Sequence, residues 1–168
     1  MGVHNSEPEK LKAAVGSVLS QSVSDIEFII CDDGSDNGTG RLLSEISDSR
    51  VKIITFKENR GLAAALNACI DIAQGKYIAR QDDDDISLPG RFENQTAYLD
   101  SHGETYFIGT NCELYSESEG VYGERIMPPM VDKKSFLFNS PFIHGSMMFR
   151  REVFDKERYR TLGKNRKY

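Results

Sequence analysis

Two acidic clusters contain the residues of this sequence that are best suited to chemistry. Four consecutive aspartates, residues 82–85, directly follow the apolar run YIA and its two polar neighbours, and Asp32-Asp33 follows the apolar run FIIC. Clustered carboxylates repel one another unless a cation or a hydrogen-bond donor compensates. A hard divalent ion, Mg²⁺ or Mn²⁺, held by one or two carboxylates and by phosphate oxygens, would compensate both clusters. The alternative is a solvated acidic turn, which most aspartate runs are.

The elements that precede the acidic clusters predict that both lie at one edge of a sheet. Short apolar runs alternate with helical periodicity from residue 6 to about residue 101, a rhythm typical of βαβ units. This rhythm predicts a single α/β domain, residues 1–168, with a mostly parallel sheet and helices on both faces. Ligands bind beyond the carboxyl ends of the strands in such sheets.

The expected elements follow from apolar spacing and from helix start and stop signals. Ser6 is expected to open the first helix in a capping box with Glu9, and Gly75 to end the third helix. The expected strands cover residues 28–31, 51–56, 76–80, 106–115, 120–126 and 146–150. The expected helices cover residues 8–19, 40–47, 62–73, 89–101 and 132–138.

A possible anion site lies between the two acidic clusters. Asn59, Arg60 and Gly61 precede a helix that opens with small residues. Free backbone N–H groups at a helix start can approach an anion, and Arg60 can pair with phosphate. An ordinary turn would have the same sequence. Neither G-x-G-x-x-G nor a Walker A motif occurs, so the dinucleotide and P-loop alternatives lose their main support.

Composition narrows the class of protein. The hydrophobic content of 39% and charged content of 28% are typical of a soluble globular domain, and the net charge of −5 argues against a nucleic-acid binder. No apolar run is long enough to span a bilayer, and no signal-peptide pattern occurs. Cys31, Cys69 and Cys112 are interpreted as reduced core residues of a cytoplasmic protein. The basic tail, residues 156–168, could contact an anionic membrane surface or nucleic acid, although a solvated end is favoured.

Several motifs in order resemble a known family. The segments VHNSE, CDDGSDNGT, ENRGLAAALNACI and ARQDDDDISLPGRFENQ resemble the nucleotide-sugar-binding half of family-2 glycosyltransferases, which have the GT-A fold. The segment HGSMMFRREVF resembles their acceptor side. The resemblance implies an inverting hexosyltransferase that moves a sugar from a nucleoside-diphosphate sugar, with UDP favoured, to a saccharide or lipid-linked acceptor. Such enzymes often build surface polysaccharide, here at the inner face of the membrane. The alternatives are a non-catalytic nucleotide-sugar-binding module and a metal-dependent nucleotidyltransferase or phosphohydrolase.

The resemblance also implies roles for single residues on the donor side. Asp82 would face the ribose, Asp84 would ligate Mn²⁺ or Mg²⁺, Asp83 would be exposed and dispensable, and Asp85 would orient the loop through hydrogen bonds. The other expected donor-binding residues are Val3, His4 and Asn5 near the base, Asp32 and Asp33 at the uracil or ribose, and Arg60 near the base and phosphates.

On the acceptor side, the resemblance implies that His144 and Gly145 line the pocket, while a purely structural hydrogen bond of His144 is equally compatible with the sequence. The general base is expected beyond Tyr168, because Asp155 and Glu157 follow the acceptor segment too closely. We therefore expect weak turnover from these residues alone. The first strand is expected to be shortened at Met1, which would leave a gap in mid-sheet.

Overall fold

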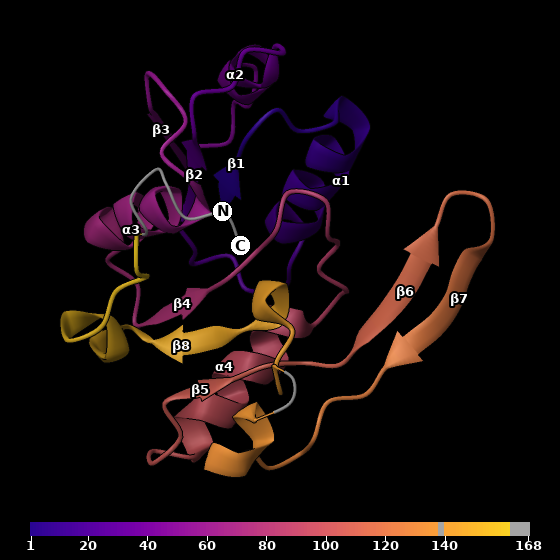
Figure 1. Cartoon of the computed structure of the whole chain (residues 1–168), viewed down its shortest axis with the longest axis vertical. Coiled ribbons are helices and arrows are strands. Elements are labelled where there is room, and N and C mark those ends of the chain that lie inside the picture. Colours follow the sequence, from indigo (N-terminus) through magenta and orange to yellow (C-terminus); the bar gives the residue numbers. More distant parts are fainter. Residues whose placement is uncertain (138–139, 162–168) are drawn as a thin grey trace.

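The computed structural model describes residues 1–137 and 140–161, which form an α/β fold with two small sheets and a separate hairpin (Figure 1). The first sheet is parallel, in the order β1-β2-β3. Its strands are β1 (Gly2–Val3), β2 (Phe28–Asp32) and β3 (Val51–Thr55). In its register Val3 pairs with Asp32 and Asp32 pairs with Thr55, so the three strands end together.

Strand β2 is buried along its whole length because helices cover both faces of the parallel sheet. Successive side chains of a strand point to opposite faces. Phe28 and Ile30 accordingly join the cluster that contains helix α1 (Pro8–Leu19), and Ile29 and Cys31 pack with Ala65 and Cys69 of helix α3 (Leu62–Ile72). The expected parallel sheet with helices on both faces is confirmed. All three cysteines are free, and Cys112 is half-buried rather than in the core.

The helices mostly follow their apolar spacing. Helix α4 (Arg91–Ser101) buries Phe92, Gln95 and Leu99, and helix α2 (Thr39–Ser44) is shorter than the expected 40–47. The predicted capping box at Ser6 is wrong. Glu7 is the N-cap of α1 without a side-chain cap, because the Ser6 hydroxyl donates to Asp83 instead.

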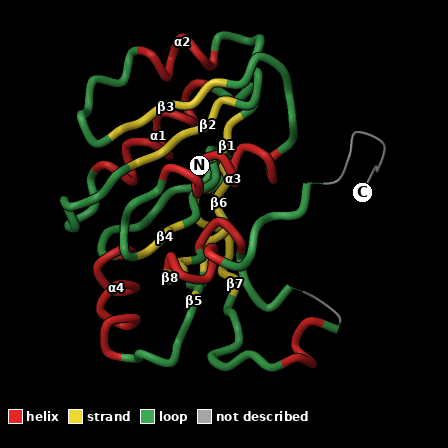
Figure 2. The backbone as a smooth tube through the Cα atoms, turned by 90° about the vertical axis from the view of Figure 1, so that its left-hand side faces the viewer, coloured by secondary structure: helices red, strands yellow, loops and turns green. Residues whose placement is uncertain are grey.

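The second sheet contains β4 (Tyr77–Ala79), β8 (Met148–Arg150) and β5 (Phe107–Ile108), in the order β4-β8-β5 and with antiparallel pairing. Figure 2 shows the two sheets in separate parts of the molecule. The expectation that the strand at residues 76–80 extends the parallel sheet is therefore not met. A common core still joins the sheets, because Val3 and Ile30 belong to the same buried cluster as Leu99 and Met148.

The remaining elements are short. The single strand expected at residues 106–115 is divided between β5 and β6 (Cys112–Ser116), and β6 forms a hairpin with β7 (Gly120–Arg125) that extends from the body in Figure 1. The expected helix at 132–138 is a 3₁₀ turn, and its last residue lies outside the described residues. The 3₁₀ turns are η1 (Lys133–Phe136), η2 (His144–Ser146) and η3 (Arg151–Asp155). No helix within the described ranges has the length and apolarity to cross a membrane.

Candidate functional site

The acidic pair at the end of β2 is buried and bound to backbone. Asp33 is 3% exposed, and its two carboxylate oxygens accept the N–H groups of Arg60, at 2.7 Å, and Gly61, at 2.8 Å. The Asp33 N–H in turn donates to the carbonyl of Val3 at 2.8 Å. Because the N–H groups of Arg60 and Gly61 donate to the Asp33 carboxylate, they are not free to bind a phosphate. The predicted anion site at these N–H groups is therefore not observed. Asp33 positions the turn that carries the Arg60 side chain.

Asp32, also buried, organises the turn after β2. Its Oδ1 accepts the N–H of Ser35 at 3.0 Å. Gly34 lies at φ +69°, and a Cβ there would clash with the backbone of Glu58. Only glycine allows this turn to approach the segment before α3 so closely.

The loop after β1 is bound to the loop after β2. The His4 Nδ1–H donates to the carbonyl of Asp33 at 2.9 Å. Asn5, at φ +53°, donates its N–H to Ser35 Oγ and accepts the N–H of Asp36 on Oδ1, both at 2.9 Å. The expected donor-binding residues of these two loops therefore lie together, with the side chains of His4 and Asn5 exposed.

The acidic loop, residues 82–85, is joined to the same edge of the fold. The Ser6 hydroxyl, directly after the β1 loop, donates to Asp83 Oδ2. The prediction that Asp83 is exposed is wrong, since the residue is half-buried and holds this contact. Asp84 is exposed, and among the residues that the structure describes its carboxylate makes no hydrogen bond or ion pair.

Asp82 and Asp85 converge on Gly145. A Cβ added to Gly145 would lie 2.6 Å from Asp82 Oδ2 and 2.7 Å from Asp85 Oδ2, so any side chain at this position would displace the two carboxylates. Burial of the Asp85 carboxylate, together with the charges of Asp82 and Asp84, raises its pKa. Arg80, which is 4% exposed, pairs with Asp82 and partly compensates this charge.

Arg91 is a site residue that the sequence did not reveal. Its Nη1 donates to Gln81 Oε1 at 2.9 Å and to Ser87 Oγ at 2.7 Å. Its Nη2 donates to the carbonyls of Arg80, at 2.7 Å, and Gly145, at 3.2 Å. Burial lowers the pKa of Arg91 to about 10 despite the nearby charge of Asp85. The Arg91 guanidinium thus connects the start of the acidic loop to the turn η2.

His144 lies next to Gly145 but is engaged by a tyrosine. Its Nε2 lies 2.8 Å from Tyr159 Oη, and the two rings meet edge to face. Burial of the ring lowers the pKa of His144, so the neutral form is favoured at pH 7. The structural alternative for His144 is therefore observed, and its role toward an acceptor stays a prediction.

Arg60 presents its guanidinium at the surface. The group stacks 4.5 Å from the centre of the Phe56 ring, which fixes its direction while leaving its N–H donors exposed. A stacked guanidinium is well suited to pair with phosphate oxygens.

The acidic loop offers hard oxygen donors that fit Mg²⁺ or Mn²⁺. Within the described residues, no group of three or more His, Cys, Asp or Glu side chains could hold a metal ion by itself. An ion that keeps phosphate and water ligands needs only one or two carboxylates. The exposed Asp84 supplies one carboxylate, and the packed oxygens of Asp82 and Asp85 lie in the same loop. The residues present therefore fit a cation that is bound together with a diphosphate.

Comparison with known proteins identifies the family. Residues 1–158 match Glycosyl transferase family 2, and the chain belongs to this family. It is 41% identical over 165 residues to "Putative glycosyltransferase EpsE" of Bacillus subtilis, covering 96% of this chain and 57% of the relative. It is 30% identical over 139 residues to the Escherichia coli UDP-Glc:alpha-D-GlcNAc-diphosphoundecaprenol beta-1,3-glucosyltransferase WfgD, covering 83% of this chain and 54% of the relative. The chain thus spans about half the length of the curated relatives it matches.

A solved structure supports the fold. The mannosyltransferase PcManGT from Pyrobaculum calidifontis, in complex with GDP-Man and Mn²⁺, superposes with a TM-score of 0.66 at 16% identity, covering 92% of this chain and 44% of that one. The fold is therefore that of the GT-A glycosyltransferases, as the sequence motifs predicted.

Proposed function

We propose that these residues form the donor-binding part of a glycosyltransferase that transfers a sugar from a nucleoside-diphosphate sugar during surface-polysaccharide synthesis. One observation carries the proposal. The loops after β1, β2 and β4 are hydrogen-bonded to one another, through Val3–Asp33 and Ser6–Asp83, at the edge where the strands end. This edge presents an exposed carboxylate, Asp84, and an exposed guanidinium, Arg60. A diphosphate with a divalent cation matches that pair of charges.

Each loop has a separate task in the proposal. His4 and Asn5 lie beside the nucleoside, Asp32 and Asp33 hold the loops that surround it, and Arg60 pairs with the phosphates. Asp82 faces the ribose, and Asp84 ligates Mn²⁺ or Mg²⁺. The cation, when bound, neutralises negative charge that develops on the departing diphosphate. The contacts of Asp82 and Asp85 with Gly145 support a loop that is already positioned before the donor arrives.

The substrate classes are proposed from the named relatives. WfgD is named as acting from UDP-Glc on a diphosphoundecaprenol-linked sugar, and PcManGT was solved with GDP-Man and Mn²⁺. We propose a UDP-sugar donor and a saccharide or lipid-linked acceptor for this chain. A lipid-linked acceptor would place the protein at the cytoplasmic face of a membrane, in peripheral contact with it.

The test is incubation with a panel of UDP- and GDP-sugars, Mn²⁺ and a lipid-linked sugar acceptor, with release of free nucleoside diphosphate as the readout. We expect Mn²⁺-dependent binding of one nucleotide, and release of its nucleoside diphosphate only when the acceptor is present. Binding without release from any version of the protein would identify a binding module. Release of pyrophosphate from a nucleoside triphosphate and a sugar phosphate would identify a nucleotidyltransferase and overturn the proposal.

Inversion would require a general base that removes the proton of the acceptor hydroxyl. Asp155 and Glu157 are exposed, at and just beyond the end of η3, and we do not assign the base to them. We propose that the base lies beyond Tyr168, so that residues 1–168 bind the donor but turn it over roughly 10²- to 10⁴-fold more slowly than a version extended by its natural downstream residues. Equal turnover by the two versions would place the base within this chain.

A further inference from the structure

The segment after η3 is attached to helix α3 through its backbone. Asn67 of α3 donates from Nδ2 to the carbonyl of Tyr159 at 2.9 Å, and its Oδ1 accepts the N–H of Tyr159 at 3.0 Å. One turn further along the helix, Asp71 pairs with Arg158 at 3.3 Å. Because Asn67 binds both backbone polar groups of Tyr159, the tyrosine side chain takes no part in this attachment.

The Tyr159 side chain instead reaches the turn η2. Its ring lies beside that of the buried Phe154, with 6.2 Å between the ring centres. Its Oη lies 2.8 Å from Nε2 of His144, which directly precedes Gly145 in η2. Within the described ranges this is the one hydrogen bond of the phenol group. A single hydroxyl thus links the segment held by α3 to the imidazole of His144.

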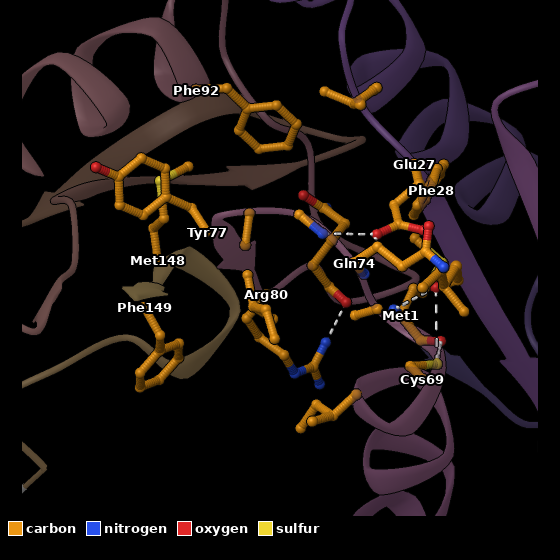
Figure 3. Close-up of a pocket in the computed structure, with 18 of the residues that line it drawn as sticks. Met1, Glu27, Phe28, Cys69, Gln74, Tyr77, Arg80, Phe92, Met148 and Phe149 are labelled. Carbon is orange, nitrogen blue, oxygen red and sulfur yellow. Dashed lines mark hydrogen bonds between the residues drawn. The ribbon is translucent and has the colours of Figure 1, made fainter. Parts of the chain in front are cut away.

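Both partners of this hydrogen bond are uncharged at neutral pH. Figure 3 shows Arg80 among the residues that line a cavity of about 650 Å³, and Tyr159 lines the same cavity. Burial raises the pKa of Tyr159 and outweighs the opposite effect of the Arg80 charge. Partial burial of the imidazole, together with the Arg80 charge, lowers the pKa of His144, although the Asp82 charge acts the other way. A protonated phenol therefore meets a neutral imidazole.

The proton of the neutral imidazole can be on Nδ1 or on Nε2, and the hydrogen bond made by one nitrogen decides between them. If Nε2 carried it, the phenol proton of the half-buried Tyr159 would have no acceptor among residues 1–137 and 140–161. An O–H group without a partner in such a place is unfavourable. If Nδ1 carries the proton, the phenol donates to Nε2 and both groups are satisfied. The Nδ1–H of the exposed His144 then has no acceptor in the described part of the chain.

We propose that Tyr159 is a positioning residue, which holds His144 in the Nδ1–H tautomer and so makes it an uncharged hydrogen-bond donor to a hydroxyl of the acceptor saccharide. The identity of this ligand rests on the proposed function. A hydroxyl fits better than a phosphate, because the carboxylates of Asp82 and Asp85 closely approach the neighbouring Gly145. In this tautomer neither imidazole nitrogen has a free lone pair, so His144 does not serve as the general base.

The tautomer is measured by long-range ¹H–¹⁵N NMR at about pH 8, above the ordinary pKa of histidine. The sequence has three histidines, and loss of signals in His144→Gln identifies those of His144. We expect a protonated Nδ1 in the parent protein and a shift toward the Nε2–H form in Tyr159→Phe. This change keeps the ring and the backbone contacts with Asn67. The control is Tyr106→Phe, which removes an exposed hydroxyl and should leave the tautomer unchanged.

A major Nε2–H form in the parent would overturn the inference, and this spectrum needs no variant. An unchanged His144 tautomer in Tyr159→Phe would overturn the role of Tyr159.

The role toward the acceptor is tested by UDP release from a panel of UDP-sugars with Mn²⁺ and α-D-GlcNAc-diphosphoundecaprenol, the acceptor in the name of WfgD. Tyr159→Phe should raise the KM for this acceptor roughly two- to tenfold, the usual effect of one hydrogen bond, with little change in the KM for the donor. Equal increases in both KM values would indicate a general structural role and refute the assignment. A protonated Nδ1 without any UDP release would retain the tautomer and refute the proposed function with this acceptor. Release with an unchanged acceptor KM would retain the proposed function and refute the donor role of His144.

Discussion

Both carboxylate oxygens of Asp33 accept backbone N–H groups, from Arg60 and Gly61. The change Asp33→Asn would put an amide NH₂ against one of these donors. We expect it to lower the free energy of unfolding by about 1–3 kcal/mol, the usual cost of an unsatisfied buried group, and to weaken UDP binding by releasing the Arg60 turn. Urea unfolding and calorimetry measure the two effects. The exposed Asp36→Asn is the control, expected within about 0.5 kcal/mol of the parent. Indistinguishable results for the two variants would refute the positioning role.

Asp84 and Asp83 are neighbours with different surroundings, which makes them a matched pair for testing the metal site. Asp84→Asn should weaken Mn²⁺-dependent UDP binding by at least about tenfold, because it removes the exposed carboxylate that is available to a cation. Asp83→Asn retains an oxygen that can accept from Ser6, so UDP binding should change much less. Calorimetric titration with UDP, once in Mn²⁺ and once in EDTA, separates the metal-dependent part of the UDP affinity. A larger loss in Asp83→Asn than in Asp84→Asn would contradict the assignment.

The chemical character of the site could be predicted from single residues of the sequence. The hydrogen-bond partners of these residues could not. Asp32, Asp33 and the acidic loop follow apolar runs, and strand ends are where α/β sheets bind ligands. Ser6 and Asp83 are 77 positions apart, and their contact depends on how the first and fourth strands are placed in space. In the sequence, nothing distinguishes Arg91 from any other polar residue at the start of a helix. Its role depends on four acceptors from three separate segments, which no local pattern encodes.

At the scale of elements, the turn before β3 carries a pH-dependent contact. Arg50 donates from Nη2 to Asp48 Oδ2 at 2.8 Å and to the carbonyl of Leu19, at the end of α1, at 3.0 Å. Hydrogen bonds from Arg50 lower the pKa of Asp48 from 3.8 to about 2. A carboxyl group whose pKa is lower in the folded than in the unfolded protein stabilises the folded state when the pH is above its ordinary pKa. This contribution is lost as the pH falls toward the pKa of the folded state.

We therefore expect Asp48→Asn to be less stable than the parent protein at pH 7, and the difference to shrink as pH falls from 3.8 to about 2. The urea concentration at the midpoint of unfolding, measured for both proteins from pH 7 to about pH 2, gives this difference in stability. Asp25→Asn, at an exposed aspartate, is the control and should show no such convergence. A constant difference between Asp48→Asn and the parent at all pH values would show that the ionised carboxylate is not the cause.

Elements with a strong local period were predictable, and those defined by distant pairing were not. Helices α1, α3 and α4 lie close to the expected ranges because their apolar residues repeat at helical spacing. The pairing of β4 with β8 joins segments about 70 residues apart, and the three residues of each strand carry too little pattern to specify a neighbour. The long apolar run at 106–115 was divided because its middle, around Gly109, packs against Phe142 and Ser146 rather than continuing as a strand.

At the scale of the whole molecule, a shared core compensates for the division into two sheets. Val3 and Ile30 of the parallel sheet lie in one buried cluster with Met148 of the antiparallel sheet and Leu99 of α4. Such a cluster couples the sheets even though no backbone ladder connects them in the described residues. The family resemblance predicted the overall fold correctly, because the fold follows from the order of motifs.

The shared core predicts that the two sheets unfold together. Met148 is 3% exposed, and Met148→Ala should lower the free energy of unfolding by about 2–5 kcal/mol, since it removes buried methylene groups and leaves a cavity. The control Met130→Ala, at a residue 84% exposed, should change it by less than about 0.5 kcal/mol. Native-state hydrogen exchange at Ile30 in β2 and Phe149 in β8 reports on the two sheets separately. If Met148 belongs to one cooperative core, its loss accelerates exchange equally at both amides. Acceleration at Phe149 alone would mean that the sheets are independent units, and that the loops after β2 and β4 are held together only by side-chain contacts such as Ser6–Asp83.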